Sequence, residues 1–200
     1  MTIDIDEAKV ERNEFGLWLG WTLATAGGML IGFLPSLFLV NVLNLGLAQI
    51  VVPALAGTLV GLAQWVALRR FLTAHSDWIL ASGTSWAVGY VVGLFLIQNM
   101  STTALGAIAG YLLFGAIVAI VQWPLLRREI PHLFTWILAS AIGWAAGFWA
   151  SQAVLPLFYN GSLMAPALST TIIAVTSGLV AGAITGLALV WIVRKPDVVV

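Results

Sequence analysis

Six long runs of apolar residues follow one another along the chain, separated by short polar or charged segments. Each run has about 20 residues or more, which a helix rising 1.5 Å per residue needs to cross roughly 30 Å of hydrocarbon. Runs of this length indicate membrane-spanning helices. The expected spans are residues 15–34, 45–68, 78–97, 104–126, 134–155 and 168–193.

The composition points to an all-α integral membrane protein. Hydrophobic residues make up 61% of the chain and charged residues only 8%, values far from those of soluble domains. We therefore expect a single six-helix membrane domain over residues 15–193. It follows an N-terminal segment, residues 1–14, and precedes a short tail, residues 194–200.

The charged residues fall into four short segments that alternate with uncharged ones: the N-terminus and residues 69–77, 127–129 and 194–197. With six spans, all four segments lie on one side of the membrane. Because Lys and Arg near span ends are retained in the cytoplasm, both termini are predicted to be cytoplasmic, in a bacterial inner or photosynthetic membrane. The N-terminus lacks the basic start of a cleavable signal, so the first span is expected to be retained. A formal net charge of zero argues against nucleic acid as a partner.

One segment occurs twice in similar form. QWVALRRFLTAHSDWILASGTSW begins at Gln64, and QWPLLRREIPHLFTWILASAIGW begins 58 residues later at Gln122. The preceding helix repeats three times, as GTLVGLAQWVALRR from Gly57, GAIVAIVQWPLLRR from Gly115 and, more weakly, GAITGLALVWIVRK from Gly182. These repeats predict three helical hairpins of the same orientation around an axis along the membrane normal. The hairpins cover about residues 15–68, 78–126 and 134–193.

The tryptophans divide by their expected depth. In the partner helices, WTLATAGG at Trp21 is matched with WAVGYVVG at Trp86 and WAAGFWAS at Trp144. Trp86 and Trp144 lie eight residues inside their spans, where they either fill the core or line a pigment, quinone or lipid pocket. The tryptophans near span ends are expected in an interfacial aromatic belt: Trp18, Trp65, Trp78, Trp123, Trp136 and Trp191.

Glycines recur at four-residue spacing in several spans, which places them on one face of each helix. In lipid, small residues let helix backbones approach closely, and this approach drives much of the association between spans. Close helix packing is therefore expected at Gly28, Gly32, Gly57, Gly61, Gly89, Gly93, Gly178, Gly182 and Gly186.

Candidate chemistry is sparse. No Asp, Glu, Lys, Arg or His lies within the expected spans, which disfavours pumps, proton-coupled transporters and intramembrane acid proteases. Gln64 and Gln122 are expected to hydrogen-bond across helices, whereas the third repeat has Leu189 at that position. His75 and His132 could ligate haem iron, zinc or chlorophyll magnesium, or contact a pigment or lipid. No second ligand stands at metal spacing, so surface histidines and no metal site are favoured.

Nothing in the sequence matches a catalytic motif, and the chain has no cysteine, so no catalytic residue is expected and the protein is predicted not to be an enzyme. The cofactor stays open. The pairing of QWxxLRR with WILASxxxW, over roughly residues 57–151, resembles a group of uncharacterised bacterial membrane proteins from phototrophic bacteria and their relatives. That group has no assigned activity, so the resemblance implies nothing about mechanism.

Three functional hypotheses remain. The favoured one is a non-enzymatic accessory, assembly or scaffold subunit of a larger membrane complex, photosynthetic or respiratory, in contact with lipid or pigment. Its partners would be membrane lipid and either a protein within the membrane or further copies of the chain. The alternative is a channel or facilitator for a neutral or apolar solute along the repeat axis. A lipid-acting enzyme would need His75 or His132 in a cleft.

Overall fold

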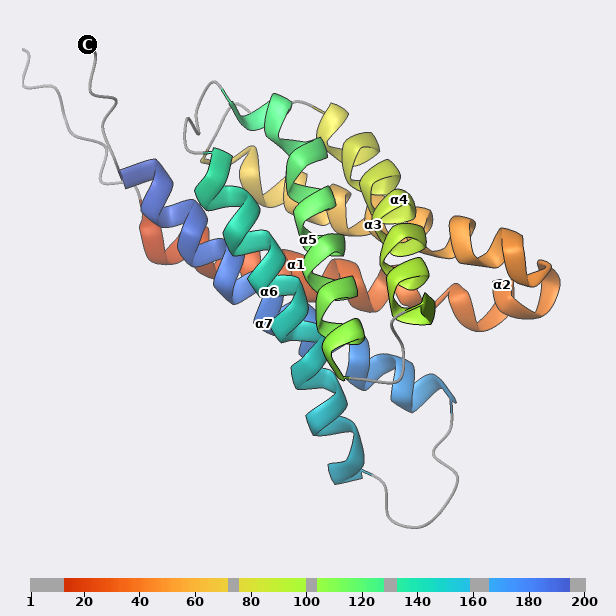
Figure 1. The fold of residues 1–200 in the computed structure, drawn as a ribbon. Helices are drawn as coiled ribbons and strands as arrows, with labels where there is room; N and C mark the ends of the chain where they lie inside the picture. Colours follow the sequence, from red (N-terminus) through yellow and green to blue (C-terminus); the bar gives the residue numbers. More distant parts are fainter. Residues whose placement is uncertain (1–12, 72–75, 100–103, 128–132, 159–165, 195–200) are drawn as a thin grey trace, which may run out of the picture.

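A computed structural model of the chain describes residues 13–71, 76–99, 104–127, 133–158 and 166–194 (Figure 1), and every element in these ranges is helical. Six helices are long, and two short ones follow the first and the fifth of them. In chain order they are α1 (Glu14–Phe33), α2 (Ser36–Val42), α3 (Leu45–Leu68), α4 (Asp77–Asn99), α5 (Ala104–Leu126), α6 (Leu133–Val154), the 3-10 helix η1 (Leu155–Phe158) and α7 (Pro166–Arg194).

Six helices of the described chain are long and apolar enough to cross a membrane. The protein is therefore an all-α integral membrane protein, as the sequence predicted. The long helices begin and end within about two residues of the expected spans. Helix α2 was not expected, and it lengthens the turn between the first two spans. At the start of α3, Asn44 Oδ1 accepts a hydrogen bond from the backbone N–H of Leu47 at 2.9 Å, which caps the helix.

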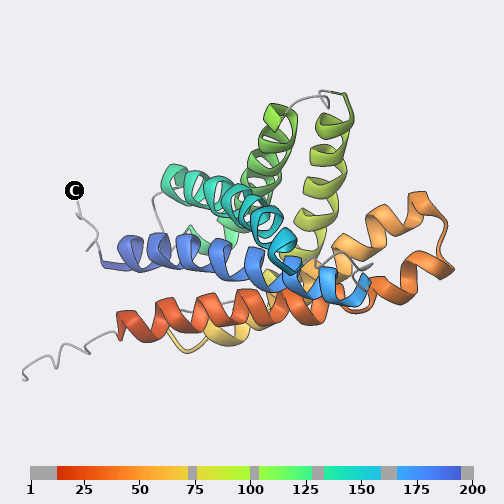
Figure 2. The same cartoon turned by 90° about the horizontal axis from the view of Figure 1, so that it is seen from below.

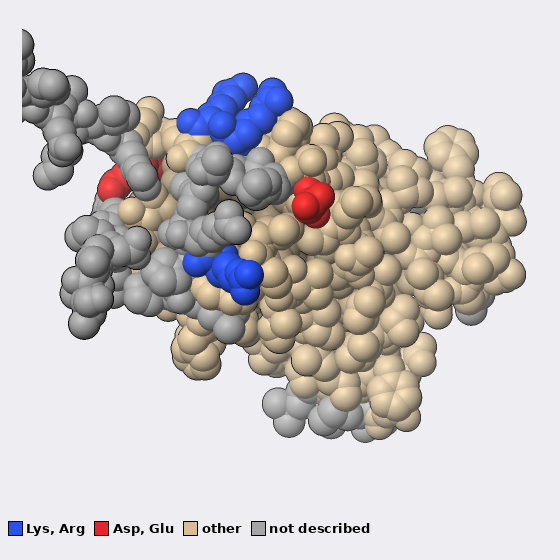
Figure 3. Space-filling view, turned by 90° about the horizontal axis from the view of Figure 1, so that it is seen from above, with Lys and Arg blue, Asp and Glu red and all other residues tan. Residues whose placement is uncertain are grey.

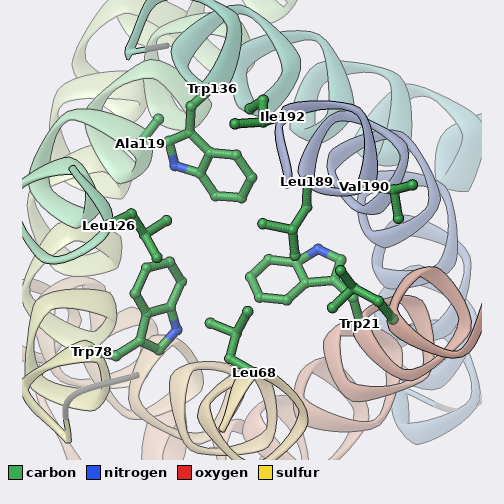
Figure 4. Packing of buried hydrophobic residues seen from close by; sticks show 10 residues of the cluster. Trp21, Leu68, Trp78, Ala119, Leu126, Trp136, Leu189, Val190 and Ile192 are labelled. Atoms are coloured by element: carbon green, nitrogen blue, oxygen red, sulfur yellow. The ribbon is translucent and has the colours of Figure 1, made fainter. Parts of the chain in front are cut away.

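The six long helices form a closed ring. Each one packs against the next along the chain, and α7 packs against α1 to complete the circle. Figure 4 looks along the axis of this ring, with side chains from several helices converging on its centre. Because every helix has two long neighbours, the fold has no isolated hairpin.

Six helix ends meet at one end of the molecule. Each of them contributes a residue to one buried cluster, which holds Leu17, Leu68, Trp78, Leu126, Trp136 and Ile192. We call this end the charged end, because Glu14, Arg69, Asp77 and Arg127 lie at the ends of these helices. Arg69 and Arg127 are thus on the same side. Figure 3 shows the blue and red side chains gathered toward one end, while the visible surface toward α2 is tan.

At the opposite, uncharged end the helices part. The paired helix ends of α1 and α3, of α4 and α5, and of α6 and α7 extend in three different directions in Figure 1 and Figure 2. The molecule therefore resembles a tripod, with its joint at the charged end and three helical hairpins as legs.

Glycines provide the closest contacts between helices. A Cβ atom added at any of the nine glycines singled out in the sequence would come within 3.1 Å of an atom of another helix. Gly57, Gly115 and Gly182 occupy matching positions and seat α3 on α4, α5 on α6 and α7 on α1, respectively. These contacts join each hairpin to the next. They agree with a threefold repeat, and the repeat itself remains a prediction.

A candidate aromatic binding cavity

The axis of the ring is filled at the charged end by a first tryptophan layer, formed by Trp21, Trp78 and Trp136 (Figure 4). The ring of Trp21 meets those of Trp78 and Trp136 edge to face, at centroid distances of 6.0 and 5.9 Å. None of the three side chains is more than 2% exposed. Assigning Trp78 and Trp136 to an interfacial belt was therefore wrong. Both residues lie near the start of their helices, as expected, but their side chains point inward to the axis of the ring.

A second aromatic layer follows toward the uncharged end. Trp86 meets Trp144 and Phe114 edge to face at 4.9 and 5.3 Å, and Phe114 meets Trp144 at 5.7 Å. The matching of Trp21 with this layer was also wrong, because the described ring contacts of Trp21 are with Trp78 and Trp136 of the first layer. Met29, fully buried in the same cluster as Trp86, occupies the corresponding place on α1.

Two buried glutamines between the layers make hydrogen bonds across helices. Gln64 donates from Nε2 to Thr25 Oγ1 at 3.1 Å and accepts at Oε1 from the Trp78 indole at 3.3 Å. Gln122 donates from Nε2 to Ser82 Oγ at 3.0 Å. All five side chains are buried, so each bond is made in a place where water competes little. The glutamines thus serve helix association rather than a solvent-lined path.

The third hairpin carries Leu189 where the other two have glutamine, and its hydrogen bonds differ accordingly. The Trp21 indole donates to Thr185 Oγ1 at 2.8 Å, one helical turn away from Leu189. Leu189 is fully buried in the cluster of the first tryptophan layer. Together with the indoles it closes the axis, so the described residues leave no open path through the charged half.

A cavity of about 160 Å³ lies beyond the second aromatic layer, where the three legs begin to part. All six long helices contribute to its wall, and the wall is mostly aromatic and aliphatic. Its members are Phe33, Pro53, Trp86, Gly89, Tyr90, Gly93, Leu94, Ile97, Gly110, Tyr111, Phe114, Phe148 and Ile173. The cavity is partly open, and it is close in size to the roughly 150 Å³ apolar cavity that admits benzene in another protein.

The aromatic wall is held by its own packing. Tyr111 stacks on Phe148 with ring centroids 4.6 Å apart, and Phe148 meets Phe114 edge to face at 5.9 Å. Gly93 and Gly110 bring α4 and α5 into backbone contact on the same wall. These contacts restrict the rotation of one another's rings, so the cavity has a defined shape in the absence of a ligand.

Polar groups are few in this wall. Among its described residues, Tyr90 and Tyr111 carry hydroxyl groups, and none carries a carboxylate, amine, imidazole, amide or thiol side chain. The cavity can therefore hold an apolar group by shape and contact area. It offers no general acid or base other than a phenol.

The residues predicted as sites fall into three groups. Trp86 lies in the cavity wall and Trp144 directly against it, on Trp86 and Phe114. Gln64 and Gln122 lie between the layers, and the nine glycines at helix contacts. His75 and His132 are outside the described residues.

Tyr111, Phe114 and Phe148 were not predicted as site residues. A signal was present, because Tyr111 and Phe114 are three residues apart and Trp144 and Phe148 four, which puts each pair on one helix face. Aromatic pairs at this spacing on neighbouring spans, opposite glycines, would have indicated a shared aromatic wall.

No family model matched the chain, and neither did any curated protein or any solved structure. The likeness to bacterial membrane proteins with repeated QWxxLRR and WILASxxxW segments therefore stays an expectation from the sequence.

Proposed function

We propose that the protein is a non-enzymatic accessory or scaffold subunit of a larger membrane complex. In this role it binds the apolar part of one lipid-soluble molecule in the aromatic cavity. The observation that carries the proposal is the preformed aromatic wall around about 160 Å³ of space. An aromatic or quinone ring, or the end of a hydrocarbon chain, matches this wall in size and polarity. Membrane lipids, quinones and pigments all present such groups.

The composition of the wall supports binding rather than catalysis. Its described residues hold no nucleophile paired with a base, and the described chain has no group of three or more His, Asp or Glu residues that could hold a metal ion. The Tyr90 and Tyr111 hydroxyls could donate a hydrogen bond to a carbonyl or ester oxygen. A bound molecule with an apolar body and one oxygen acceptor would satisfy both features of the wall.

The position of the cavity supports entry from the membrane. It lies on the uncharged side of the second aromatic layer, between residues of all six long helices. We place the charged end in the cytoplasm of a bacterium, because Arg69, Arg70 and Arg127 lie there and Lys or Arg residues near span ends are retained inside. The cavity then belongs to the outer half of the inner membrane.

The structure gives less support to the other sequence hypotheses. A channel or facilitator along the axis would need both aromatic layers to open, since Trp21, Trp78 and Trp136 are buried against one another. Docking of a protein partner through the glycine faces is weakened too, because those faces are used inside the ring. Gly20 and Gly27 of α1 have no neighbour within 4 Å of an added Cβ and are the glycines left for such a contact.

Photolabelling tests the proposal. The purified protein in lipid nanodiscs is irradiated with a diazirine-bearing stearic acid or a diazirine-bearing quinone, and the adducts are mapped by mass spectrometry. We expect labelling concentrated on the cavity wall, on both α4 and α5. The more efficient of the two probes distinguishes a chain from a ring as the bound group.

Two matched variants make the test specific. Leu94→Trp fills the cavity, whereas Leu80→Trp on the same helix adds an equal volume at a side chain that is 69% exposed. Leu94→Trp should lower labelling of the wall at least severalfold, and Leu80→Trp should leave it unchanged, with both variants folded by their thermal transitions. Equal labelling in the two variants, or adducts spread evenly over the lipid-facing surface, would refute the proposal.

A further inference from the structure

The indole N–H of Trp136 is a buried donor without a hydrogen-bond acceptor among the described residues. The Trp136 side chain is 1% exposed. Buried donors are almost always paired, because an unpaired one loses its bond to water and gains nothing in return. Trp21 and Trp78, in the same layer, each donate to a side-chain oxygen. The unpaired state of Trp136 therefore needs an explanation.

The three indoles of the layer point in a common sense around the axis. In Figure 4 the nitrogen of Trp21 faces α7, beside Leu189, and that of Trp78 faces α3, beside Leu68. The nitrogen of Trp136 faces α5, between Ala119 and Leu126. Each indole thus turns its donor toward the last helix of the preceding hairpin, where Trp21 and Trp78 find their acceptors.

The acceptor expected for Trp136 is Gln122, 58 residues after the Gln64 that serves Trp78. Gln122 uses its amide nitrogen to bond Ser82 Oγ. No direct bond joins its oxygen to the Trp136 indole in the described structure, although both residues line the same small cavity.

That cavity lies on the axis between the two aromatic layers. The space open to the centre of a water-sized sphere is about 10 Å³, close to the minimum that holds one water molecule. Its polar wall comes from Gln64, Gln122, Trp136, Ser140 and Thr185, and the rest is aromatic apart from Val118. A site with several polar groups and of this size is what a buried water molecule requires.

Some hydrogen-bond donors and acceptors in the wall of this cavity are available to a water molecule. The Ser140 hydroxyl donates to the backbone oxygen of Gly115 at 2.9 Å and keeps an acceptor lone pair. Thr185 donates to Ala181 O at 2.7 Å and already accepts from Trp21. The open positions are thus a donor on Trp136 and acceptors on Gln122 and Ser140.

We propose that one water molecule is bound in this axial cavity, accepting a hydrogen bond from Trp136 Nε1 and donating to Gln122 Oε1 and Ser140 Oγ. It would complete, through a bridge, the contact that Trp78 makes directly with Gln64. Its partners lie on α5 and α6, so it would tie the second hairpin to the third. The proposal does not depend on any ligand in the aromatic cavity.

Solution NMR tests this on the folded wild-type protein. The chain is labelled with ¹⁵N-indole tryptophan and placed in bicelles, and the Trp136 and Trp78 signals are assigned by their loss in Trp136→Phe and Trp78→Phe. We expect a direct cross-relaxation peak between water and the Trp136 indole proton, and none for Trp78, whose acceptor is a side chain. Absence of the Trp136 peak, or an equal peak for both indoles, would overturn the proposal.

A structure at high resolution supplies the second measurement. Electron density for one molecule within hydrogen-bond distance of Trp136 Nε1, Gln122 Oε1 and Ser140 Oγ would support the bridge. A direct bond between Gln122 Oε1 and Trp136 Nε1, with no density between the layers, would refute it. This structure is determined on the wild-type protein, so misfolding of a variant cannot affect the result.

Discussion

Gly115 joins the second and third hairpins, and replacing it with alanine should weaken this joint. A Cβ at position 115 would lie 2.7 Å from the Cα of Ala141 and against the backbone oxygen of Ser140. Carbon atoms prefer separations of about 3.5 to 4.0 Å, so α5 and α6 would have to move apart by roughly 1 Å. The contacting atoms belong to backbone, which cannot rotate away as a flexible side chain could.

The control is Gly27→Ala in helix α1, where an added Cβ has no heavy atom within 4 Å. Both changes replace glycine inside a long helix, so the gain in helix propensity of about 0.5 to 1 kcal/mol is common to both. The difference between the two variants therefore isolates the cost of crowding. Overpacking typically costs about 1 to 3 kcal/mol, so Gly115→Ala should be less stable than Gly27→Ala by that amount.

Equilibrium unfolding in mixed micelles, with increasing fractions of sodium dodecyl sulfate, measures this difference. Tryptophan fluorescence reports the transition, because the indoles of both aromatic layers become exposed when the ring opens. We expect the Gly115→Ala midpoint to fall below the wild-type value and the Gly27→Ala midpoint to equal or exceed it. If the two variants unfold within about 0.5 kcal/mol of each other, close packing at Gly115 is not what holds these hairpins together.

Three further predictions follow from other parts of the molecule. Gln64→Leu should lower the free energy of unfolding by about 1 to 3 kcal/mol in the same assay, because it leaves the buried Trp78 indole without its acceptor. Asn44→Ala removes the cap of α3 and should cost about 0.5 to 2 kcal/mol, without change in the tryptophan emission of the folded state. In this cysteine-free chain, a membrane-impermeant maleimide should label Asn99→Cys in intact spheroplasts and Ser76→Cys only in inverted vesicles; the reverse pattern would contradict the proposed orientation.

The positions of the spans could be predicted from the sequence because the requirement is simple. A helix that crosses hydrocarbon needs a minimum length of apolar residues, and charges are excluded from its middle. The turn signals of α2 were hidden because SLFLVNV is itself apolar and reads as a continuation of its neighbours. Length and polarity thus fixed where helices cross, but not every place where the chain turns.

The arrangement of the tryptophans could not be predicted in the same way. Trp78 and Trp136 stand near their span ends, where an interfacial position is common, and nothing in a one-dimensional pattern tells which way such a residue faces. The first hairpin added to the difficulty, because it has Met29 where the other two have Trp86 and Trp144. Matching tryptophan to tryptophan then shifted α1 by two helical turns. Side-chain contacts across the axis were needed to set the register.

The tripod shape makes the protein's mechanics unequal along the membrane normal. At the charged end Trp21 packs edge to face on Trp78 and Trp136, and this buried cluster draws on all six long helices, so the helices are held together there. Away from that end the three hairpins diverge, so a small rotation at the base of one hairpin would produce a larger displacement at its far end. The aromatic cavity lies where the hairpins diverge, so if it binds a lipid-soluble molecule as proposed, its width and affinity would depend on the thickness of the surrounding leaflet.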